Sequence, residues 1–378
     1  MNRSRFLFVW STVVGGACGG ADGPAAVAVD STGGLRASIA TVGVDLPTRY
    51  AVTVDGGAPR SVAVNDSVEF VGLRRGPHKI VLSEMGNDCT VANGASQDVV
   101  VGFNTTAFAS FGVTCWGRGL GGVQLAFARK ADIYRMSLSG ADLVQLTTDG
   151  HNSAPAWSPD GRRIAFTSWR DAGVASAPDI YIMDADGSNL VRRTTTRTAS
   201  SPVWSPDGRK IAFTKWNPDG GEIYVANATD DGTAPIRLAN GCFPDWSPDG
   251  GKIVFSAPNC DEVDYDDIYV MKADGSNIAR LTDGATTNSL YWDAAWSPDG
   301  RQIALTVCRP VCSVGVMNAD GSALRTVGLG SRPRWSPNGR LIAFTDFGPS
   351  NNTVHGAAAD GSFRGVIAVN AFYADWRR

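Results

Sequence analysis

The pentapeptide Trp-Ser-Pro-Asp-Gly begins at Trp157, Trp204, Trp246 and Trp296, and a variant with Asn in fourth place begins at Trp335. In such a segment proline presets the φ angle of a turn, aspartate bonds back to the backbone, and glycine accepts a left-handed conformation. Short strands that recur with a period of roughly forty residues are typical of radial arrays of sheets. The repeat therefore predicts an all-β propeller, and a motif present in every blade is scaffold rather than a ligand site.

A second signature, a short apolar strand, occurs six times, once more than the tryptophan motif. Its copies lie at 125–127, 164–166, 211–213, 253–255, 303–305 and 342–344. The first copy has no tryptophan strand ahead of it, whereas the chain ends on an unassigned strand that contains Trp376. A C-terminal strand that completes the first blade would leave no open edge between the two ends. We therefore predict six blades over residues 123–378, closed by the last strand.

The repeats resemble those of TolB-type six-bladed β-propeller proteins. The resemblance rests on the stretches 157–166, 179–189 and 280–282, with variants elsewhere. As a family, TolB is periplasmic, binds the peptidoglycan-associated lipoprotein across its propeller, and carries a mixed α/β domain before it. The resemblance implies a propeller that binds a partner in the cell envelope, although the segment ahead of the propeller departs from the family pattern.

That segment, residues 35–116, predicts a small β-sandwich. It contains seven short runs of alternating residues, at 36–42, 50–55, 61–65, 68–73, 79–83, 98–103 and 107–114. So many short strands in so few residues favour two packed sheets. The stretch 71–82 resembles the prealbumin-like and carboxypeptidase-regulatory-like sandwiches of exported proteins. Residues 117–122, mostly glycine, are the expected linker to the propeller.

The first 17 residues predict an export signal. Arg3 and Arg5 precede an apolar run at 6–14, which is too short to span a bilayer, and small residues then lead to Cys18. This arrangement resembles the bacterial lipoprotein processing site, whose cysteine is acylated. We expect a lipoprotein of the periplasm or outer membrane that contacts the membrane through this lipid anchor only. Secretion without acylation is the alternative. Residues 18–34 are the expected flexible tether.

The six other cysteines predict disulfides, because they can pair completely in an oxidising compartment. Cys308 and Cys312 would face each other across a tight hairpin. Cys242 and Cys260 fall at the two ends of one antiparallel pair, and the N-terminal segment holds the last two, Cys89 and Cys115. A metal site is disfavoured because the sequence lacks a Cys-x-x-Cys pair.

The stretch 261–267 is the one weak candidate for a metal site. Its carboxylates are those of Asp261, Glu262, Asp264, Asp266 and Asp267. Oxygen ligands at this density suit Ca²⁺, but such loops are more often simply solvated, so we expect no cofactor. The Asp-Gly-Ser segments that begin at Asp186, Asp274 and Asp320 are turns, because they lack the glutamate that ends a calcium loop.

The candidate binding site is the mouth of the propeller channel. The residue pairs that lead into the inner strands are 152–153, 200–201, 242–243, 292–293, 331–332 and 372–373. We select Asn152, Trp292, Asp293, Arg332 and Tyr373 as ligand-binding candidates, because arginine and aromatic residues dominate binding hot spots. Packing between blades is the other explanation for the aromatic residues.

These observations predict a non-enzymatic, monomeric binding or scaffold protein whose partner is an envelope protein, peptide or glycan. The net charge of −3 gives no electrostatic footprint for nucleic acid. The chain contains three histidines and no Gly-x-Ser-x-Gly elbow, which disfavours a hydrolase. The alternative is a metal-dependent hydrolase or lyase that works at the channel mouth.

Overall fold

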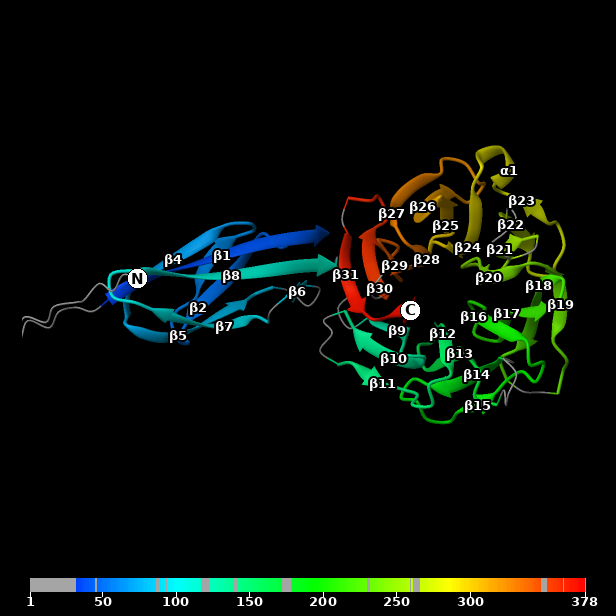
Figure 1. Ribbon diagram of the computed structural model, residues 1–378, viewed down its shortest axis with the longest axis horizontal. Coiled ribbons are helices and arrows are strands. Elements are labelled where there is room, and N and C mark those ends of the chain that lie inside the picture. Colours follow the sequence, from blue (N-terminus) through cyan, green and yellow to red (C-terminus); the bar gives the residue numbers. More distant parts are fainter. Residues whose placement is uncertain are drawn as a thin grey trace, which may run out of the picture.

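The computed structural model describes residues 32–44, 46–85, 89–92, 94–116, 123–138, 142–171, 178–229, 232–258, 260, 266–347, 352–362 and 364–377. The described residues form eight four-stranded sheets and a single helical turn, α1 (Gly284–Thr287). Two sheets precede residue 117 and six follow it, as Figure 1 shows. The predicted fold class, a six-bladed propeller preceded by a β-sandwich, is confirmed. None of the described helical structure is long and apolar enough to cross a membrane.

The sandwich packs one sheet of order β4-β1-β8-β6 against another of order β3-β2-β5-β7. Its strands are β1 (Thr32–Val44), β2 (Arg49–Val54), β3 (Arg60–Ala63), β4 (Ser67–Arg74), β5 (Gly76–Ser83), β6 (Cys89–Val91), β7 (Ser96–Val101) and β8 (Thr106–Trp116). Alternate residues of both sheets fill a core that includes Leu35, Tyr50, Ile80 and Phe111. The sequence pattern missed β6, because it has three residues and lies at a sheet edge, where Cys89 pairs with Cys115 of β8.

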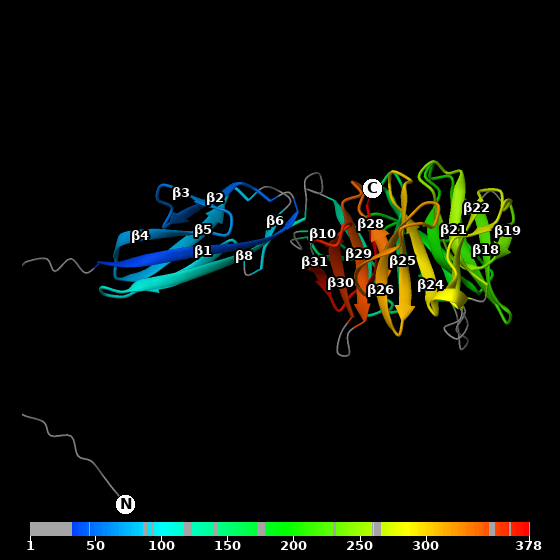
Figure 2. The same cartoon turned by 90° about the horizontal axis from the view of Figure 1, so that it is seen from above.

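The two longest strands of the sandwich, β1 and β8, run parallel in continuous register from Gly34 opposite Thr106 to Val44 opposite Trp116. Both strands therefore begin at one end of the sandwich and finish at the other. The chain enters β1 at the first end, and it leaves β8 for the propeller at the second, as Figure 2 illustrates. This parallel pair gives the sandwich two distinct ends.

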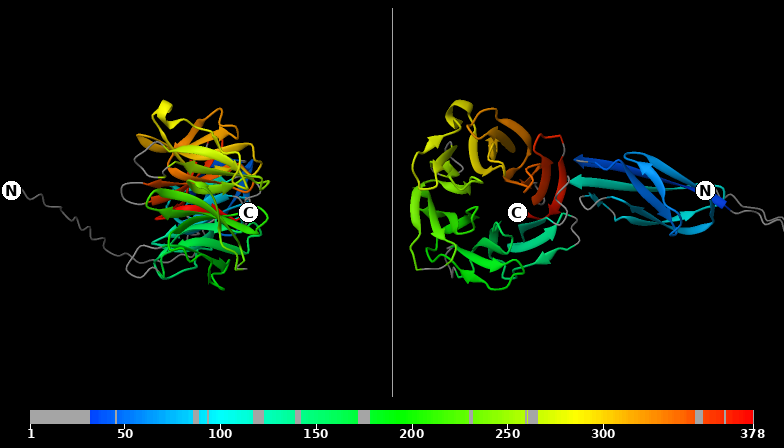
Figure 3. Two further views of the ribbon diagram at one scale, coloured as in Figure 1. Left: turned by 90° about the vertical axis from the view of Figure 1, so that its right-hand side faces the viewer. Right: turned by 180° about the vertical axis from the view of Figure 1, so that it is seen from behind.

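The propeller blades are numbered in chain order, and each has one strand at the channel and three outside it (Figure 3). Blade 1 contains β9 (Gln124–Arg129), β10 (Asp132–Ser137) and β11 (Val144–Gln145) with the closing strand β32 (Phe372–Trp376); blade 2 β12 (Asn152–Trp157), β13 (Arg163–Ser168), β14 (Asp179–Asp184) and β15 (Val191–Arg192); blade 3 β16 (Ala199–Trp204), β17 (Lys210–Asn217), β18 (Gly220–Asn227) and β19 (Ile236–Asn240); blade 4 β20 (Cys242–Trp246), β21 (Lys252–Ala257), β22 (Asp267–Lys272) and β23 (Ala279–Arg280); blade 5 β24 (Leu290–Trp296), β25 (Gln302–Arg309), β26 (Val311–Asn318) and β27 (Arg325–Leu329); and blade 6 β28 (Ser331–Trp335), β29 (Leu341–Phe347), β30 (Asn352–Ala358) and β31 (Arg364–Val369).

The repeated pentapeptide forms the turn between the first and second strands of a blade. In blade 2 the Ser158 hydroxyl donates to the Asp160 carboxylate at 2.6 Å, and Asp160 also accepts from the backbone N–H of Arg162 at 3.1 Å. Gly161 takes a φ of 65°, in the left-handed region. These hydrogen bonds lower the pKa of Asp160, the Ser158 hydroxyl contributing most. The turn chemistry expected from the sequence is confirmed.

One hydroxyl group connects each pair of blades from blade 2 onward. A threonine or serine on the second strand of a blade accepts a hydrogen bond from a backbone N–H on the inner strand of the next blade. The donor–acceptor pairs are Ser201–Thr167 at 3.0 Å, Phe243–Thr214 at 3.0 Å, Asp293–Ser256 at 3.0 Å, Arg332–Thr306 at 2.9 Å and Tyr373–Thr345 at 3.3 Å. Ala128 holds this position in blade 1, so that junction lacks the hydroxyl.

The last strand closes the ring as predicted. β32 pairs with β9 in antiparallel register, with Trp376 opposite Leu125. The Trp376 ring is 1% exposed, and its Nε1 donates to the carbonyl oxygen of Arg334 in blade 6 at 3.0 Å. A carboxylate oxygen of Asp375 accepts from the backbone N–H of Trp157 in blade 2 at 2.8 Å. Five C-terminal residues therefore connect three blades.

We expect Trp376→Ala to lower the free energy of unfolding by about 3–5 kcal/mol, because it empties a buried indole site at the closure. Trp376→Phe keeps most of the packing and loses only the Nε1 hydrogen bond, so its cost should be about 1 kcal/mol. Denaturant unfolding followed by circular dichroism measures both changes. Equal stability of Trp376→Ala and the wild type would show that the closure is not needed.

The sandwich contains a buried histidine with an acceptor at each ring nitrogen. Nδ1 of His78 lies 2.6 Å from Oδ2 of Asp55, and Nε2 lies 2.7 Å from the carbonyl oxygen of Arg74. Two acceptors favour the doubly protonated ring, since only the imidazolium donates from both nitrogens. The Arg74 carbonyl, followed by Asp55, accordingly raises the pKa of His78, although burial opposes the shift.

The raised pKa makes the stability of the sandwich depend on pH. A histidine whose pKa is higher in the folded state contributes stability that is complete below its unfolded pKa, about 6.5, and is lost as the pH rises through the folded pKa. The melting temperature of the wild type should therefore fall as the pH rises from 6 to alkaline values. His78→Asn should flatten this dependence, whereas His151→Asn, at an exposed histidine of the propeller, should preserve it.

Candidate functional site

The inner strands of the six blades enclose a channel along the propeller axis. Each inner strand ends on a buried tryptophan, and two rings of side chains above it line the channel. The residues three before the tryptophans form the first ring, Ala154, Ser201, Phe243, Asp293, Arg332 and Tyr373, and those one before form the second, Ala156, Val203, Asp245, Ala295, Arg334 and Asp375. The space that they border measures about 910 Å³, open solvent included.

A bulge in every inner strand places the first ring. At all six positions φ is positive, between 47° for Ala154 and 60° for Arg332, and each falls within a register shift against the neighbouring strand. Non-glycine residues rarely adopt this conformation, which costs of order 1–3 kcal/mol per residue when the surrounding structure imposes it. The N–H groups of five of these residues make the inter-blade hydrogen bonds described above. The blade junctions therefore hold the bulges in place.

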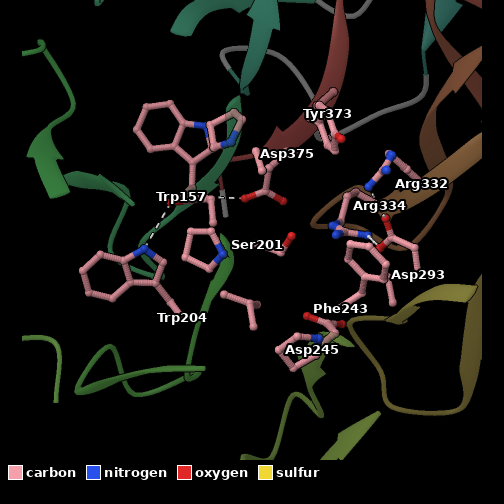
Figure 4. A pocket seen from close by; sticks show the side chains of 18 of the residues that line it. Trp157, Ser201, Trp204, Phe243, Asp245, Asp293, Arg332, Arg334, Tyr373 and Asp375 are labelled. Carbon is pink, nitrogen blue, oxygen red and sulfur yellow. Dashed lines mark hydrogen bonds and ion pairs between the residues drawn. The ribbon is translucent and has the colours of Figure 1, made fainter. Parts of the chain in front are cut away.

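The channel lining is chemically one-sided, as Figure 4 shows. Blades 2 and 3 contribute the small residues Ala154, Ala156, Ser201 and Val203. Blades 4 to 6 and the closing strand contribute the charged and aromatic residues Phe243, Asp245, Asp293, Arg332, Arg334, Tyr373 and Asp375. A ligand at this mouth would therefore meet charged and aromatic side chains on one side and small side chains on the other.

Arg332 is the centre of an aromatic cluster on the charged side. Its guanidinium carbon lies 4.2 Å from the ring centroid of Tyr373, 4.8 Å from that of Trp292 and 5.4 Å from that of Phe243. The rings of Phe243 and Trp292 contact each other, with centroids 5.9 Å apart. All three rings stay partly exposed, whereas the Arg332 side chain is 16% exposed. Cation–π attraction to several rings orients the guanidinium.

Asp293 fixes two arginines at once. Its Oδ2 lies 3.3 Å from an Nη1 atom of Arg332, and its Oδ1 accepts from Nη1 of Arg334 at 2.8 Å. The carboxylate is 2% exposed, so both oxygens are committed to these partners. Because φ at Asp293 is 49°, the bulge turns this carboxylate toward blade 6. One buried anion therefore holds one arginine in each ring.

Carboxylates of both rings surround Arg334. Burial lowers the pKa of its guanidinium, but the charges of Asp293, Asp245 and Asp375 outweigh burial and raise that pKa above its usual range. Asp245 accepts from the backbone N–H of Trp296 at 2.7 Å, as Asp375 does from Trp157. The carboxylates are thus held by the scaffold, and Arg334 stays charged at every accessible pH.

The structure brings four of the five predicted site residues together and places the fifth elsewhere. Trp292, Asp293, Arg332 and Tyr373 form the cluster above. Asn152 is 1% exposed and does not line the channel. Its Nδ2 donates to Thr147 at 3.0 Å, and its Oδ1 accepts from Arg170 at 3.0 Å. It stands five residues before its tryptophan, a position that is buried in other blades, as Ala199 and Tyr291 illustrate.

Sequence reasoning missed three channel residues, Asp245, Arg334 and Asp375. Each directly precedes the tryptophan of an inner strand, so alignment of the repeats on that tryptophan exposes the position. The other three blades carry Ala156, Val203 and Ala295 there. The sequence therefore did contain a signal for these three residues: one position of the repeat is charged in some blades and small in others.

One disulfide of blade 4 and one of blade 5 lie beside the Arg332 cluster. All three predicted bridges are present, Cys89–Cys115, Cys242–Cys260 and Cys308–Cys312. Cys242 directly precedes Phe243, and Sγ of Cys308 accepts from Nε1 of Trp292 at 3.4 Å. Two bridges thus restrain the backbone on which the aromatic side chains stand.

The acidic stretch lies only partly within the described residues, which exclude Asp261, Glu262 and Asp264. Asp267 accepts from Thr282 at 2.6 Å and from the Gly284 N–H at 2.8 Å. Asp179 makes the equivalent contact with Thr194 at 2.8 Å in blade 2, so Asp267 belongs to a repeated structural network. In the part of the chain that the structure describes, no three His, Cys, Asp or Glu residues gather as metal ligands would. Cys18, the candidate for lipidation, also lies outside the described residues.

We expect Asp293→Ala to destabilise the propeller by about 3 kcal/mol, because it leaves two guanidinium groups without their carboxylate. Asp293→Asn should cost less, since an amide oxygen still accepts a hydrogen bond and asparagine tolerates a positive φ. Asp219→Ala, at an exposed turn, should stay within about 0.5 kcal/mol of the wild type. Denaturant unfolding checks all three, and a similar cost for Asp293→Ala and Asp219→Ala would refute the role of Asp293.

Comparisons with known proteins agree with this architecture. Residues 196–375 match a family model described as the TolB beta propeller domain, and no curated protein sequence matches the chain. TolB from Acinetobacter baumannii aligns over 81% of this chain and 80% of that one, with TM-score 0.60 and 17% identity. A putative TolB from Agrobacterium tumefaciens aligns over 65% and 88%, with TM-score 0.53 and 20% identity. A chain of a nidogen/laminin complex aligns over 68% and 98%, with TM-score 0.51 and 16% identity.

At these identities the structural likeness establishes the fold, and the family match adds the type of repeat. Together with the six blades, these matches show that the propeller of this chain has the fold of TolB-type β-propeller domains and that residues 196–375 carry their repeat.

Proposed function

We propose that the protein is a non-enzymatic binding protein whose channel mouth holds a protein, peptide or glycan of the cell envelope. The observation that carries the proposal is the Arg332 cluster, in which a guanidinium is stacked among three partly exposed rings. Arginine, tryptophan and tyrosine are the residues that contribute most to binding energy at interfaces. The match to the TolB beta propeller domain also supports a binding role.

The cluster is organised before any ligand arrives. Asp293 and the rings already fix the Arg332 guanidinium, and two disulfides restrain the neighbouring backbone. Binding costs less when side chains lose little conformational freedom. Because Arg332 and the three rings are already held in place, little conformational freedom would be lost when a partner binds.

The rest of the chain fits export to the envelope. We propose a signal at 1–17, acylation of Cys18, a tether over 18–31, a sandwich spacer over 32–116, a linker at 117–122 and a binding propeller over 123–378. The tether is three residues shorter than the sequence predicts, because β1 begins at Thr32. Three disulfides support an oxidising compartment, because such bonds are rare in the cytosol. In this arrangement the sandwich holds the propeller away from the membrane.

The proposal predicts that one side chain of the Arg332 cluster, that of Trp292, controls binding of the partner. Immobilised wild-type protein should retain an envelope component that Trp292→Ala binds at least about tenfold more weakly, since loss of a hot-spot residue costs more than about 1.4 kcal/mol. Ile278→Ser, at a residue 52% exposed and outside the Arg332 cluster, is the matched control and should bind like the wild type. Titration calorimetry with the purified component measures the affinities. Equal binding by all three proteins would contradict the proposal.

The alternative of a metal-dependent enzyme has its own measurement. Asp293, the carboxylate of the first ring, is occupied by Arg332 and Arg334 on both oxygens, which argues against its use as a metal ligand. Elemental analysis of the purified protein tests this argument directly. A stoichiometric divalent ion that disappears in Asp293→Asn would overturn the purely binding role.

A further inference from the structure

The sandwich exposes large apolar side chains at one end. Val71, Val100, Phe103 and Phe108 keep 75%, 72%, 54% and 72% of their surface exposed. We call these four residues, together with Arg74 and Arg75, the entry tip. Isolated exposed apolar residues are normal on protein surfaces, whereas several gathered at one end mark an interaction site. Two further exposed apolar residues, Val42 and Leu46, lie toward the other end of β1.

Strand register places the four residues at the end where the chain enters. Thr32, the first residue of β1, lies opposite Arg74, the last residue of β4, and Gly34 lies opposite Thr106, the first residue of β8. Phe108 is two residues into β8, which corresponds to about 7 Å along the strand.

The remaining two apolar residues lie at the same end. Val100 is next to last in β7, and Phe103 lies in the turn between β7 and β8. The backbone N–H of Asn104 in that turn donates to the carbonyl of Thr32 at 3.1 Å. The tip is therefore built from the start of β1 and β8 and the end of β4 and β7.

The entry tip is also basic. The segments 32–36, 70–78 and 100–108, which form this end, contain Arg36, Arg74 and Arg75 and no acidic residue. Arg74 and Arg75 are exposed. Three acidic residues near this end have basic neighbours: Glu69 lies 3.8 Å from Arg36, Asp55 contacts His78, and Asp98 lies opposite Lys79. The exposed guanidinium groups of Arg74 and Arg75 add positive charge at the end of β4.

We propose that the entry tip docks onto an anionic lipid bilayer, with its apolar side chains in the headgroup boundary and Arg74 and Arg75 at the lipid phosphates. This inference rests on the lipid anchor proposed above and adds a second membrane contact to it. Apolar groups of interfacial segments insert about 5–10 Å, which matches the depth over which the four residues are distributed. Basic residues next to an anionic surface contribute about fivefold each to binding.

The length of chain before Thr32 selects a bilayer as the occupant. Thirteen residues, 19–31, separate Cys18 from the first described residue. The tether proposed above would, at that length, have a root-mean-square reach of about 20 Å. An acylated Cys18 would keep the entry tip that close to the lipid surface, while the propeller follows the opposite end of the sandwich.

Sedimentation with vesicles tests the docking independently of the anchor. The unacylated chain that begins at residue 19 retains every described residue. It should sediment with vesicles of phosphatidylethanolamine and phosphatidylglycerol. The double variant Phe103→Ser/Phe108→Ser should bind at least about tenfold more weakly, because each ring removes apolar surface from water on docking. Arg74→Gln/Arg75→Gln should lose more than tenfold on these vesicles and change little on phosphatidylcholine vesicles.

Val42→Ser is the matched control, since Val42 is 56% exposed on β1 toward the exit end. It should sediment like the wild type, and melting curves should show that all variants remain folded. The docking is overturned if the wild-type chain stays in solution with both vesicle types, or if the double phenylalanine variant sediments equally well. Mass spectrometry of membrane-extracted protein reports acylation of Cys18 separately, so failure of the anchor and failure of the tip are distinguishable.

Discussion

The pairing of β32 with β9 is the constraint on which the propeller depends. Each of the other five blades takes its four strands from consecutive chain, but blade 1 needs a strand from the far end of the sequence. Trp376 and Asp375 then bond to blades 6 and 2 across the junction. Blade 1 lacks the hydroxyl that connects the other blades, and Asp375 of the closing strand bonds to blade 2 across that same junction. Closure also completes the two rings of channel residues, because Tyr373 and Asp375 arrive only with it.

The channel shows how a repeated scaffold acquires a specific site. Every inner strand has the same bulge, and every bulge presents one side chain to the mouth. The backbone therefore offers six equivalent positions, and the sequence fills them unequally. Charged and aromatic residues in blades 4 to 6 and in β32 meet on one side of the channel, where Asp293 binds Arg332 and Arg334 together. Conversely, small residues in blades 2 and 3 leave space for a ligand.

Much of the fold and part of the candidate site followed from local pattern. The turn residues, the strand signature and the orphan Trp376 predicted six blades and their closure. Trp292, Asp293, Arg332 and Tyr373 followed from their place before an inner strand. Asn152 does not line the channel, because it stands five residues before its tryptophan, whereas the first-ring residue of its strand, Ala154, stands three before it. Asp245, Arg334 and Asp375 required the repeats to be aligned on their tryptophans.

The sequence by itself determined the blade period, the turns and the cysteine pairs, because neighbouring residues decide φ and hydrogen bonding within a turn or hairpin. Only the tertiary structure decided which copies of a position face one another. Arg332 and Asp293 are 39 residues apart, and no local rule relates them until the blades are arranged around an axis. The same holds for the sandwich, where parallel β1 and β8 gather Val71, Phe103 and Phe108 at one end. Long-range register, rather than local propensity, therefore places both proposed binding surfaces.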